Sequence, residues 1–428
     1  DFVAELSKNY LNLSQTPPFE RKIAIILANY PNKDGRLANG VGLDTPASCL
    51  NLLHALKEAG YIVENLPETT DELIQRLTSG ITNDLESQEH RQIYQFLPLE
   101  AFQTYFQSLP HTVQQPIRDR WSNHLSSLLS EPATNLPPFL MGVGGISFPQ
   151  KVEGIPIPGI QLGNIFVGIQ PSRGYDLDPS LNYHAPDLEP PPHYLAFYHW
   201  LKTHFQAQAL IHLGKHGNLE WLPGKSIALS ATCYPEITLG AIPHFYPFIV
   251  NDPGEGSQAK RRSQAVIIDH LTPPLTRAEL YGDLQQVENL IDEYYEAQSL
   301  DPKRLPLIRD RLLNLLKQTQ FHQDLGITEI NRQTIQEFLS VADGYLCELK
   351  EAQIRDGLHI LGKCPQKNQL RDLIISIARS PSYDRQGLLS ALIEDLHLEI
   401  DLKEPYQTDF KLNAKTINLC LEKHYEDL

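Results

Sequence analysis

The sequence predicts an α/β protein: parallel-sheet, Rossmann-like domains with a helical insertion, followed by a mainly helical C-terminal region. Three observations predict this class. Short apolar runs alternate with helical segments and Gly/Pro-rich loops, a pattern typical of buried parallel strands joined by crossover helices. Over residues 70–130, apolar residues recur at three- and four-residue spacing, which indicates inserted helices. From Thr276 onward the chain is polar and keeps the helical spacing.

The first predicted α/β unit covers residues 21–65. The apolar run RKIAIILANY predicts a buried strand, and PASCLNLLHALKEAG predicts a helix that Asp44 or Thr45 caps and Gly60 ends. The run YIVENLP is expected to form a second strand, and strand–helix–strand predicts parallel pairing through a right-handed crossover. Together with the helical insertion, this unit forms a predicted domain over residues 1–137.

A second α/β domain is predicted over residues 138–275. Four apolar runs, NIFVGIQ, AQALIHLG, FYPFIVN and AVIIDHL, are separated by loops and by helical segments such as HYLAFYHWLKTHF. This alternation predicts a further parallel sheet with helices on its faces. Residues 276–428 form the predicted helical region.

Composition excludes several classes of protein. The 428 residues include 36 Lys and Arg against 52 Asp and Glu, a net charge of −16, whereas binding of duplex nucleic acid requires clustered basic residues. No apolar window is long enough for a membrane span. Five dispersed cysteines without a CxxC pair indicate reduced thiols in a cytoplasmic protein. The chain begins without Met inside an apparent helix, so we expect the central fragment of a longer protein.

The most informative stretch is HLGKHGNLEWLPGK. His212, His216 and Glu220 are spaced four and four, but the run before them favours a strand, and the glycines disfavour a regular helix. We therefore place the three groups on a strand end and the loop after it. Two imidazoles and a carboxylate suit cobalt, zinc or iron better than magnesium. The alternative is a hydrogen-bonded histidine near a strand end and a surface glutamate.

A second polar stretch, NDPGEGSQAKRR, follows the predicted strand FYPFIVN. We expect a helix beginning near Ser257, and the absence of Gly-Lys-Ser/Thr excludes a Walker A loop. Asp252 and Glu255 can bind a cation or accept a proton. The basic run Lys260–Arg262 suits substrate carboxylates, although a solvated helix face explains it equally well.

A third polar loop, VGIQPSRGYDLDP, also follows a predicted strand and includes Arg173 and Tyr175. A structural turn explains its composition nearly as well. Ligands of open parallel sheets bind outside the carboxyl ends of the strands, so we expect the three loops to converge there. His244 and the other histidines between these loops are weak candidates, because lone histidines are usually structural.

These strings, together with ILANYPNKDGRLANGVGLDTPAS and ELKEAQIRDGLHILG, make the sequence resemble the large subunit of cobaltochelatase over about residues 20–365. That subunit belongs with the magnesium chelatase large (H) subunit in one superfamily. The resemblance implies metal insertion into a tetrapyrrole, with ATP hydrolysed only on separate AAA+ partner subunits. It implies Co²⁺ as the inserted ion and, as the ring, a corrin precursor of the hydrogenobyrinic acid a,c-diamide type in cobalamin biosynthesis.

Alternatives stay open at this point. One is a magnesium chelatase H-type subunit that inserts Mg²⁺ into protoporphyrin IX, and another is a non-catalytic module that binds tetrapyrrole and docks the ATPase. An unrelated His/Glu metallohydrolase is a third. Cobalt is favoured because imidazoles are softer ligands than magnesium prefers and because the strings resemble the cobalt branch more closely.

Metal insertion requires removal of water from the ion and of two pyrrole-type protons, and imidazole and carboxylate groups can do both. The first candidates for metal delivery or proton acceptance are His212, His216 and Glu220. Second candidates for the same roles are Glu255 and Asp252. Candidates for binding the side chains of the macrocycle are Arg173, Lys260 and Arg261. Candidates for stacking on the ring are Trp221 and Tyr175.

Overall fold

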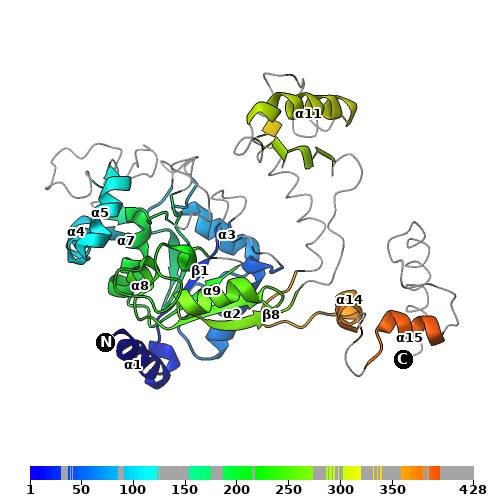
Figure 1. Cartoon of the computed structure of the whole chain (residues 1–428). Helices are drawn as coiled ribbons and strands as arrows, with labels where there is room; N and C mark the ends of the chain where they lie inside the picture. The colour runs from blue at the N-terminus through cyan, green and yellow to red at the C-terminus, as the bar shows by residue number, and fades with distance from the viewer. Residues whose placement is uncertain are drawn as a thin grey trace. The chain divides into compact units, whose positions relative to one another are not determined.

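The computed structural model (Figure 1) describes most of the first two-thirds of the chain and shorter parts of the remainder. The described ranges are 1–29, 42–84, 91–122, 154–174, 187–214, 217–272, 302–319, 358–378 and 385–395, with a few further positions between them. The chain divides into two compact units, Asp1–Cys364 and Pro365–Leu428.

A six-stranded, mostly parallel sheet forms the centre of the first unit. Its strand order is β4-β5-β1-β6-β7-β8. All neighbours pair in parallel except β4, which runs antiparallel to β5 at one edge. The strands are β1 (Ile23–Leu27), β4 (Gly159–Leu162), β5 (Ile165–Ile169), β6 (Ala209–Leu213), β7 (His244–Ile249) and β8 (Val266–His270). The predicted α/β class and five of the predicted strands are therefore confirmed.

Helices cover both faces of this sheet, and β1 lies between β5 and β6. All five residues of β1 are buried, and they alternate between two cores because successive side chains of a strand point to opposite faces. Ile25 packs on the side of α2 (Thr45–Glu58) and α3 (Thr70–Ser79). Ile26 packs on the opposite side. The helices on that side are α4 (Leu99–Ser108), α5 (His111–Arg120), α7 (Pro192–Trp200) and α8 (Tyr234–Leu239).

The predicted second strand, YIVENLP, is wrong. Residues 61–67 contain no strand, because β5 and β6 occupy both positions beside β1. The segment instead lies beside the turn after β4. There the amide of Asn164 donates to the carbonyl of Ile62 at 3.0 Å, and the amide of Glu64 donates to the carbonyl of Leu162 at 3.3 Å.

The expected boundary at residue 137 does not separate two sheets. Strand β1 precedes it, and strands β4 to β8 follow it, yet all six form one sheet. A short antiparallel pair, β2 (Phe96–Pro98) with β3 (Gly154–Pro156), also joins the two sides. The helices expected between residues 70 and 130 are present as α3, α4 and α5.

The remaining elements of the first unit are mainly short helices. They are α1 (Phe2–Gln15), η1 (Pro18–Glu20), the π-helical turn η5 (Leu201–Phe205), η6 (Leu219–Trp221), α9 (Pro253–Arg262), η7 (Pro302–Arg304) and α11 (Leu305–Thr319). The second unit contains α14 (Lys367–Ala378) and α15 (Leu388–Asp395). The elements described beyond Thr276 are thus helices, as predicted. Among the described helices, none is both long and apolar enough to cross a membrane.

The described end of the string ELKEAQIRDGLHILG bonds to the start of α2. The amide of Asp44 donates to the carbonyl of His359 at 3.0 Å, and the amide of His359 donates to the carbonyl of Gly42 at 3.1 Å. The amide of Leu361 donates to Oγ of Ser48 at 2.9 Å. These bonds place a segment from more than 300 residues downstream beside the loop that follows β1.

Candidate active site

The loops that follow β5 and β6 meet at one edge of the sheet, as expected from the sequence. After β6, the amide of Asn218 donates to Oε1 of Gln170 at 3.1 Å, and its side-chain Nδ2 lies 3.4 Å from the carbonyl of Pro171. Both partners follow β5. Helix α9, which follows β7, contributes Arg262, whose Nη1 donates to the carbonyl of Glu220 at 2.7 Å. The loop after β6 therefore contacts both the loop after β5 and the C-terminal end of α9.

Two buried histidines on neighbouring strands lie side by side, His212 near the end of β6 and His244 at the start of β7. His212 on β6 is 2% exposed, and His244 on β7 is buried beside it. Nδ1 of His212 lies 2.9 Å from Nε2 of His244. On the other side of His212, Nε2 lies 2.9 Å from the hydroxyl of Tyr198, which in turn accepts a hydrogen bond from Gln170 at 3.0 Å.

One backbone carbonyl determines which nitrogen atoms of this histidine pair are protonated. Nδ1 of His244 lies 3.1 Å from the carbonyl oxygen of Ser263, and because a carbonyl only accepts, this nitrogen must donate. In the neutral ring Nε2 of His244 then accepts from Nδ1 of His212, so Nε2 of His212 accepts from Tyr198. Burial lowers the pKa of His244 to about 4 and holds the pKa of His212 well below its usual range.

Through its two ring nitrogens, His212 therefore links β6 to Tyr198 of α7 and to His244 of β7. Both of its ring nitrogens bond to other side chains, and its ring has almost no exposure. In this arrangement neither ring nitrogen of His212 is directed at a substrate, and its role as a metal ligand stays a prediction. The alternative of a hydrogen-bonded histidine at a strand end describes it.

Glu220 is the other buried polar group of the stretch, and it is not a surface glutamate. It lies on η6 and is 1% exposed. The hydroxyl of Tyr246 accepts from the amide of Gly217 and donates to Oε1 of Glu220 at 3.3 Å. Oε2 of Glu220 has no hydrogen-bond partner among the described residues. Burial raises the pKa of this carboxyl to about 8, so its ionised form is an unusually strong proton acceptor for a carboxylate.

Helix α9 begins earlier than the sequence predicts and thereby changes the roles of its residues. It begins at Pro253 instead of near Ser257 because Asp252 caps it, with Oδ1 accepting from the amide of Glu255 at 3.4 Å. A carboxylate of the chain itself thus lies at the helix N-terminus. Glu255 is half-buried, and its charge adds to the effect of burial in raising the pKa of Glu220.

The basic run of α9 is split between the surface and the site. Lys260 and Arg261 are exposed, whereas Arg262 is 6% exposed and binds the carbonyls of Glu220 and Lys225. The two expected macrocycle-binding residues therefore lie on the outer face of the helix, and the third basic residue enters the site.

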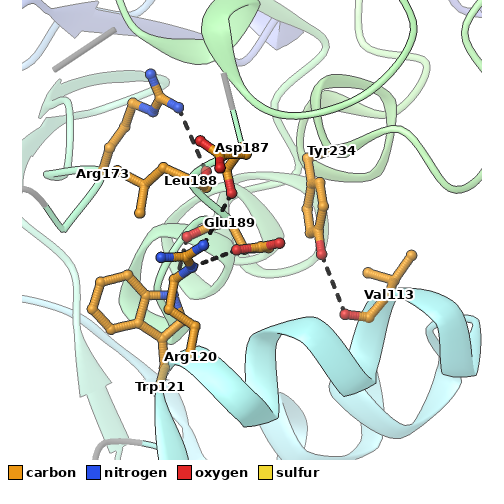
Figure 2. Close-up of polar contacts among 8 residues, drawn as sticks. All are labelled: Val113, Arg120, Trp121, Arg173, Asp187, Leu188, Glu189 and Tyr234. Atoms are coloured by element: carbon orange, nitrogen blue, oxygen red, sulfur yellow. Dashed lines mark hydrogen bonds and ion pairs between the residues drawn. The ribbon is translucent and has the colours of Figure 1, made fainter. Parts of the chain in front are cut away.

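Arg173 lies inside the protein, behind the loop that follows β5. Its side chain is fully buried, and Nη2 donates to the carbonyl of Leu188 at 3.5 Å. Figure 2 shows this guanidinium directed toward residues 187–189, the segment that the end of α5 also contacts. There Arg120 pairs with Glu189, and the indole of Trp121 donates to the carbonyl of Glu189 at 3.0 Å. Arg173 is therefore not a surface residue, although its charge lowers the pKa of Glu220 against the effect of burial, and its role toward the macrocycle stays a prediction.

The other predicted site residues are only partly described. Trp221 follows Glu220 on η6 and is half-buried. His216 and Tyr175 lie outside the described residues, so the predicted His212, His216 and Glu220 set is incomplete in the structure. Within the described part of the chain, no group of three His, Cys, Asp or Glu side chains is placed to hold a metal ion. The described cysteines, Cys49, Cys233 and Cys364, are free thiols.

Several residues of the site were not predicted from the sequence, or only weakly. Gln170, Tyr198 and Tyr246 form its hydrogen-bond network with His244, and Arg262 fixes its loop. The sequence did contain a signal for His244 and Tyr246 on β7. Positions 244 and 246 alternate with apolar residues, so both side chains point to the face that His212 occupies. Nothing local distinguished the others from ordinary core residues.

Comparisons with known proteins agree on one family. The family model CobN/Magnesium Chelatase matches residues 1–427. The chain is 47% identical over 405 residues to the aerobic cobaltochelatase subunit CobN of Pseudomonas aeruginosa, covering 94% of this chain and 31% of that protein. It is 31% identical to the magnesium-chelatase H subunit of Chlorobaculum parvum, covering 86% of this chain and 27% of that protein.

A solved structure gives the same result. The catalytic subunit of cobaltochelatase from Mycobacterium tuberculosis superposes with a TM-score of 0.61 at 39% sequence identity, covering 91% of this chain and 32% of that chain. The chain thus spans about 30% of the length of these relatives.

Proposed function

Because this chain belongs to the CobN/magnesium chelatase family, we propose that it forms part of the large subunit of an ATP-dependent cobaltochelatase. The proposed reaction inserts Co²⁺ into a corrin precursor of the hydrogenobyrinic acid a,c-diamide type in cobalamin biosynthesis. AAA+ partner subunits hydrolyse the ATP, and the complex works in the cytoplasm. Higher identity to the cobalt subunit than to the magnesium subunit, 47% against 31%, supports cobalt.

The observation that carries this proposal is the buried carboxyl of Glu220. Insertion breaks two pyrrole-type N–H bonds, forms nitrogen–metal bonds and releases two protons. Ionised Glu220 accepts one of these protons on Oε2, while Tyr246 holds Oε1. A pKa of about 8 matches the carboxylate to proton transfer near neutral pH.

Other residues have supporting roles in this proposal. His216 replaces water ligands of the incoming ion, since a neutral imidazole suits cobalt. The exposed side chains of Lys260 and Arg261 bind the carboxylate or amide groups at the rim of the ring. Trp221, and Tyr175 from the loop after β5, stack on the macrocycle.

Tryptophan fluorescence tests the substrate. The chain has three tryptophans, and Trp221 adjoins Glu220. Titration with a metal-free corrin precursor is expected to quench its emission saturably, and a Trp221→Phe variant should lose most of that quenching. Saturable quenching by metal-free protoporphyrin instead would transfer the assignment to a magnesium chelatase. Quenching by neither ring would contradict a ring-binding site in this chain.

A second experiment separates catalysis from simple binding. In the complete chelatase, Glu220→Ala is expected to abolish metal insertion while ring binding remains. Loss of both would favour a non-catalytic module that binds tetrapyrrole and docks the ATPase.

A further inference from the structure

Arg262 is the last residue of α9 and faces inward, unlike the two basic residues before it. Gly256, Ala259 and Arg262 follow one another at three-residue spacing on the buried face of the helix. Small side chains at the first two positions let the helix pack against Phe248 of β7. The guanidinium of Arg262 therefore enters the region between α9 and the loop after β6.

Two hydrogen bonds from this guanidinium fix the backbone on both sides of one short segment. Nη1 donates to the carbonyl of Glu220 at 2.7 Å, and Nε donates to the carbonyl of Lys225 at 2.9 Å. Residues 220–225 include Gly224 at a φ of +141°, packed on the side chain of Cys233. The bonds thus hold a segment whose own backbone has little regular structure.

The end of α9 that carries Arg262 is itself anchored. Oγ of Ser263 donates to the carbonyl of Ala259 at 2.8 Å, and the carbonyl of Ser263 accepts from His244. His244 therefore holds the turn that carries Arg262, and Arg262 in turn holds residues 220–225. Movement of this turn would displace the segment that carries Glu220.

We propose that Arg262 is a positioning residue that holds Glu220 in its proton-accepting place by bonding to the carbonyls of Glu220 and Lys225. The inference rests on the proposed function of Glu220. Arg262 does not touch the substrate in this proposal, because its contacts are to the backbone of the protein. Lysine is a poor replacement, since its single nitrogen cannot occupy both of the positions from which Nε and Nη1 of the planar guanidinium reach Lys225 and Glu220.

The test uses Arg262→Lys in the complete chelatase. We expect the rate constant for metal insertion to fall at least tenfold, while the dissociation constant for the metal-free ring changes less than twofold. Arg91→Lys is the matched control, because Arg91 also donates to two backbone carbonyls, those of Thr78 and Gly80. That variant should keep its insertion rate within twofold.

A double-mutant comparison identifies the residue through which Arg262 acts. In a Glu220→Gln background, Arg262→Lys should reduce the remaining insertion rate by less than twofold, because residues that act as a unit are not additive. If the two reductions multiply instead, Arg262 acts independently and the inference is overturned. If Glu220→Gln alone leaves the rate intact, the proposed function of Glu220 fails first, and the inference fails with it.

Hydrogen exchange provides a test that does not depend on activity. Amides of residues 220–225 should exchange at least tenfold faster in Arg262→Lys than in the wild type, while amides of β1 keep their protection. Unchanged exchange in this segment would refute the positioning role. Equal acceleration throughout the sheet would indicate general destabilisation and would refute it as well.

Discussion

His212 donates a hydrogen bond from Nδ1 to Nε2 of His244 over 2.9 Å, inside the sheet. The direction of this bond is fixed by the carbonyl of Ser263, which accepts from the other nitrogen of His244. Both rings are neutral, and both have lost nearly all contact with water. An arrangement of this kind couples the stability of the paired strands to pH, because a second proton on His244 would break the bond between the rings, and one on His212 would break its bond with Tyr198.

Acid is expected to destabilise the chain through His244. Its pKa is 6.5 in the unfolded chain and about 4 in the folded protein, so the unfolded state binds more protons between these values. The contribution is complete above pH 6.5 and is lost as the pH falls toward 4, by about 3 kcal/mol in total. Thermal unfolding from pH 4 to 7 measures it.

The matched variants for this measurement are His244→Asn and His54→Asn. Asparagine at position 244 can still donate to the carbonyl of Ser263 but does not titrate, so the fall in unfolding temperature below pH 6.5 should become shallower. His54 is exposed, and its replacement should leave the slope unchanged. Equal slopes in all three proteins would contradict the role of His244.

Glu220 is expected to have the opposite effect on stability. Its pKa rises from 4.5 to about 8 on folding, so its contribution is present below pH 4.5 and is lost as the pH rises through 8. Glu220→Gln should therefore raise the free energy of unfolding by about 3 kcal/mol at pH 7 and much less at pH 5. Urea unfolding at the two pH values checks this difference, and an equal change at both would disprove it.

The same carboxyl predicts the pH dependence of metal insertion. Only ionised Glu220 accepts a proton, so the insertion rate of the complete chelatase should rise with pH and level off above about 8. Glu220→Gln should lower the rate by about 100-fold or more and remove this rise. A variant that kept the wild-type profile would assign the titration to another group.

Gly174 is expected to tolerate no side chain. Its φ is +97°, and a Cβ would lie 2.3 Å from Cη2 of Trp121, so Gly174→Ala should destabilise the protein by about 1–3 kcal/mol. Gly254→Ala is the control, because the nearest atom there is 4.0 Å away, and alanine within a helix should be neutral or slightly stabilising. Calorimetric unfolding temperatures of both variants test the contrast.

Substitutions of Asp252 distinguish a helix cap from a metal ligand. Asparagine caps a helix as well as aspartate does, so Asp252→Asn should preserve both stability and insertion, whereas Asp252→Ala should cost about 1 kcal/mol. Chemical denaturation and insertion rates provide the two readouts. Loss of insertion in Asp252→Asn with full stability would restore the sequence-based metal role.

The sequence was sufficient for elements whose pattern is local, and it failed where partners come from far away. Strand β1 is predictable because an apolar run needs no partner to be recognised, but residues 61–67 have a similar pattern and form no strand. The position beside β1 that this segment was predicted to occupy is taken by β5, about 100 residues downstream. Neither apolar run specifies which strand it will pair with.

Prediction of the candidate site from the sequence was limited in the same way. The stretch with His212 and Glu220 was identified from residue types alone, but the burial of Glu220 depends on Tyr246 and Arg262, which follow it by 26 and 42 residues. Placing the start of α9 four residues too late also concealed the cap at Asp252. A helix assigned from its composition gave no reason to distinguish Arg262 from Arg261.

The central position of β1 determines the order in which this protein can be assembled during synthesis. Residues Ile23–Leu27 are made before their partners Ile165–Ile169 and Ala209–Leu213, which follow well over a hundred residues later. Until then an apolar strand remains with both edges unpaired, which favours aggregation and slow folding. A truncated chain ending near residue 137 would retain this exposed strand permanently, so recombinant fragments should extend at least through β8.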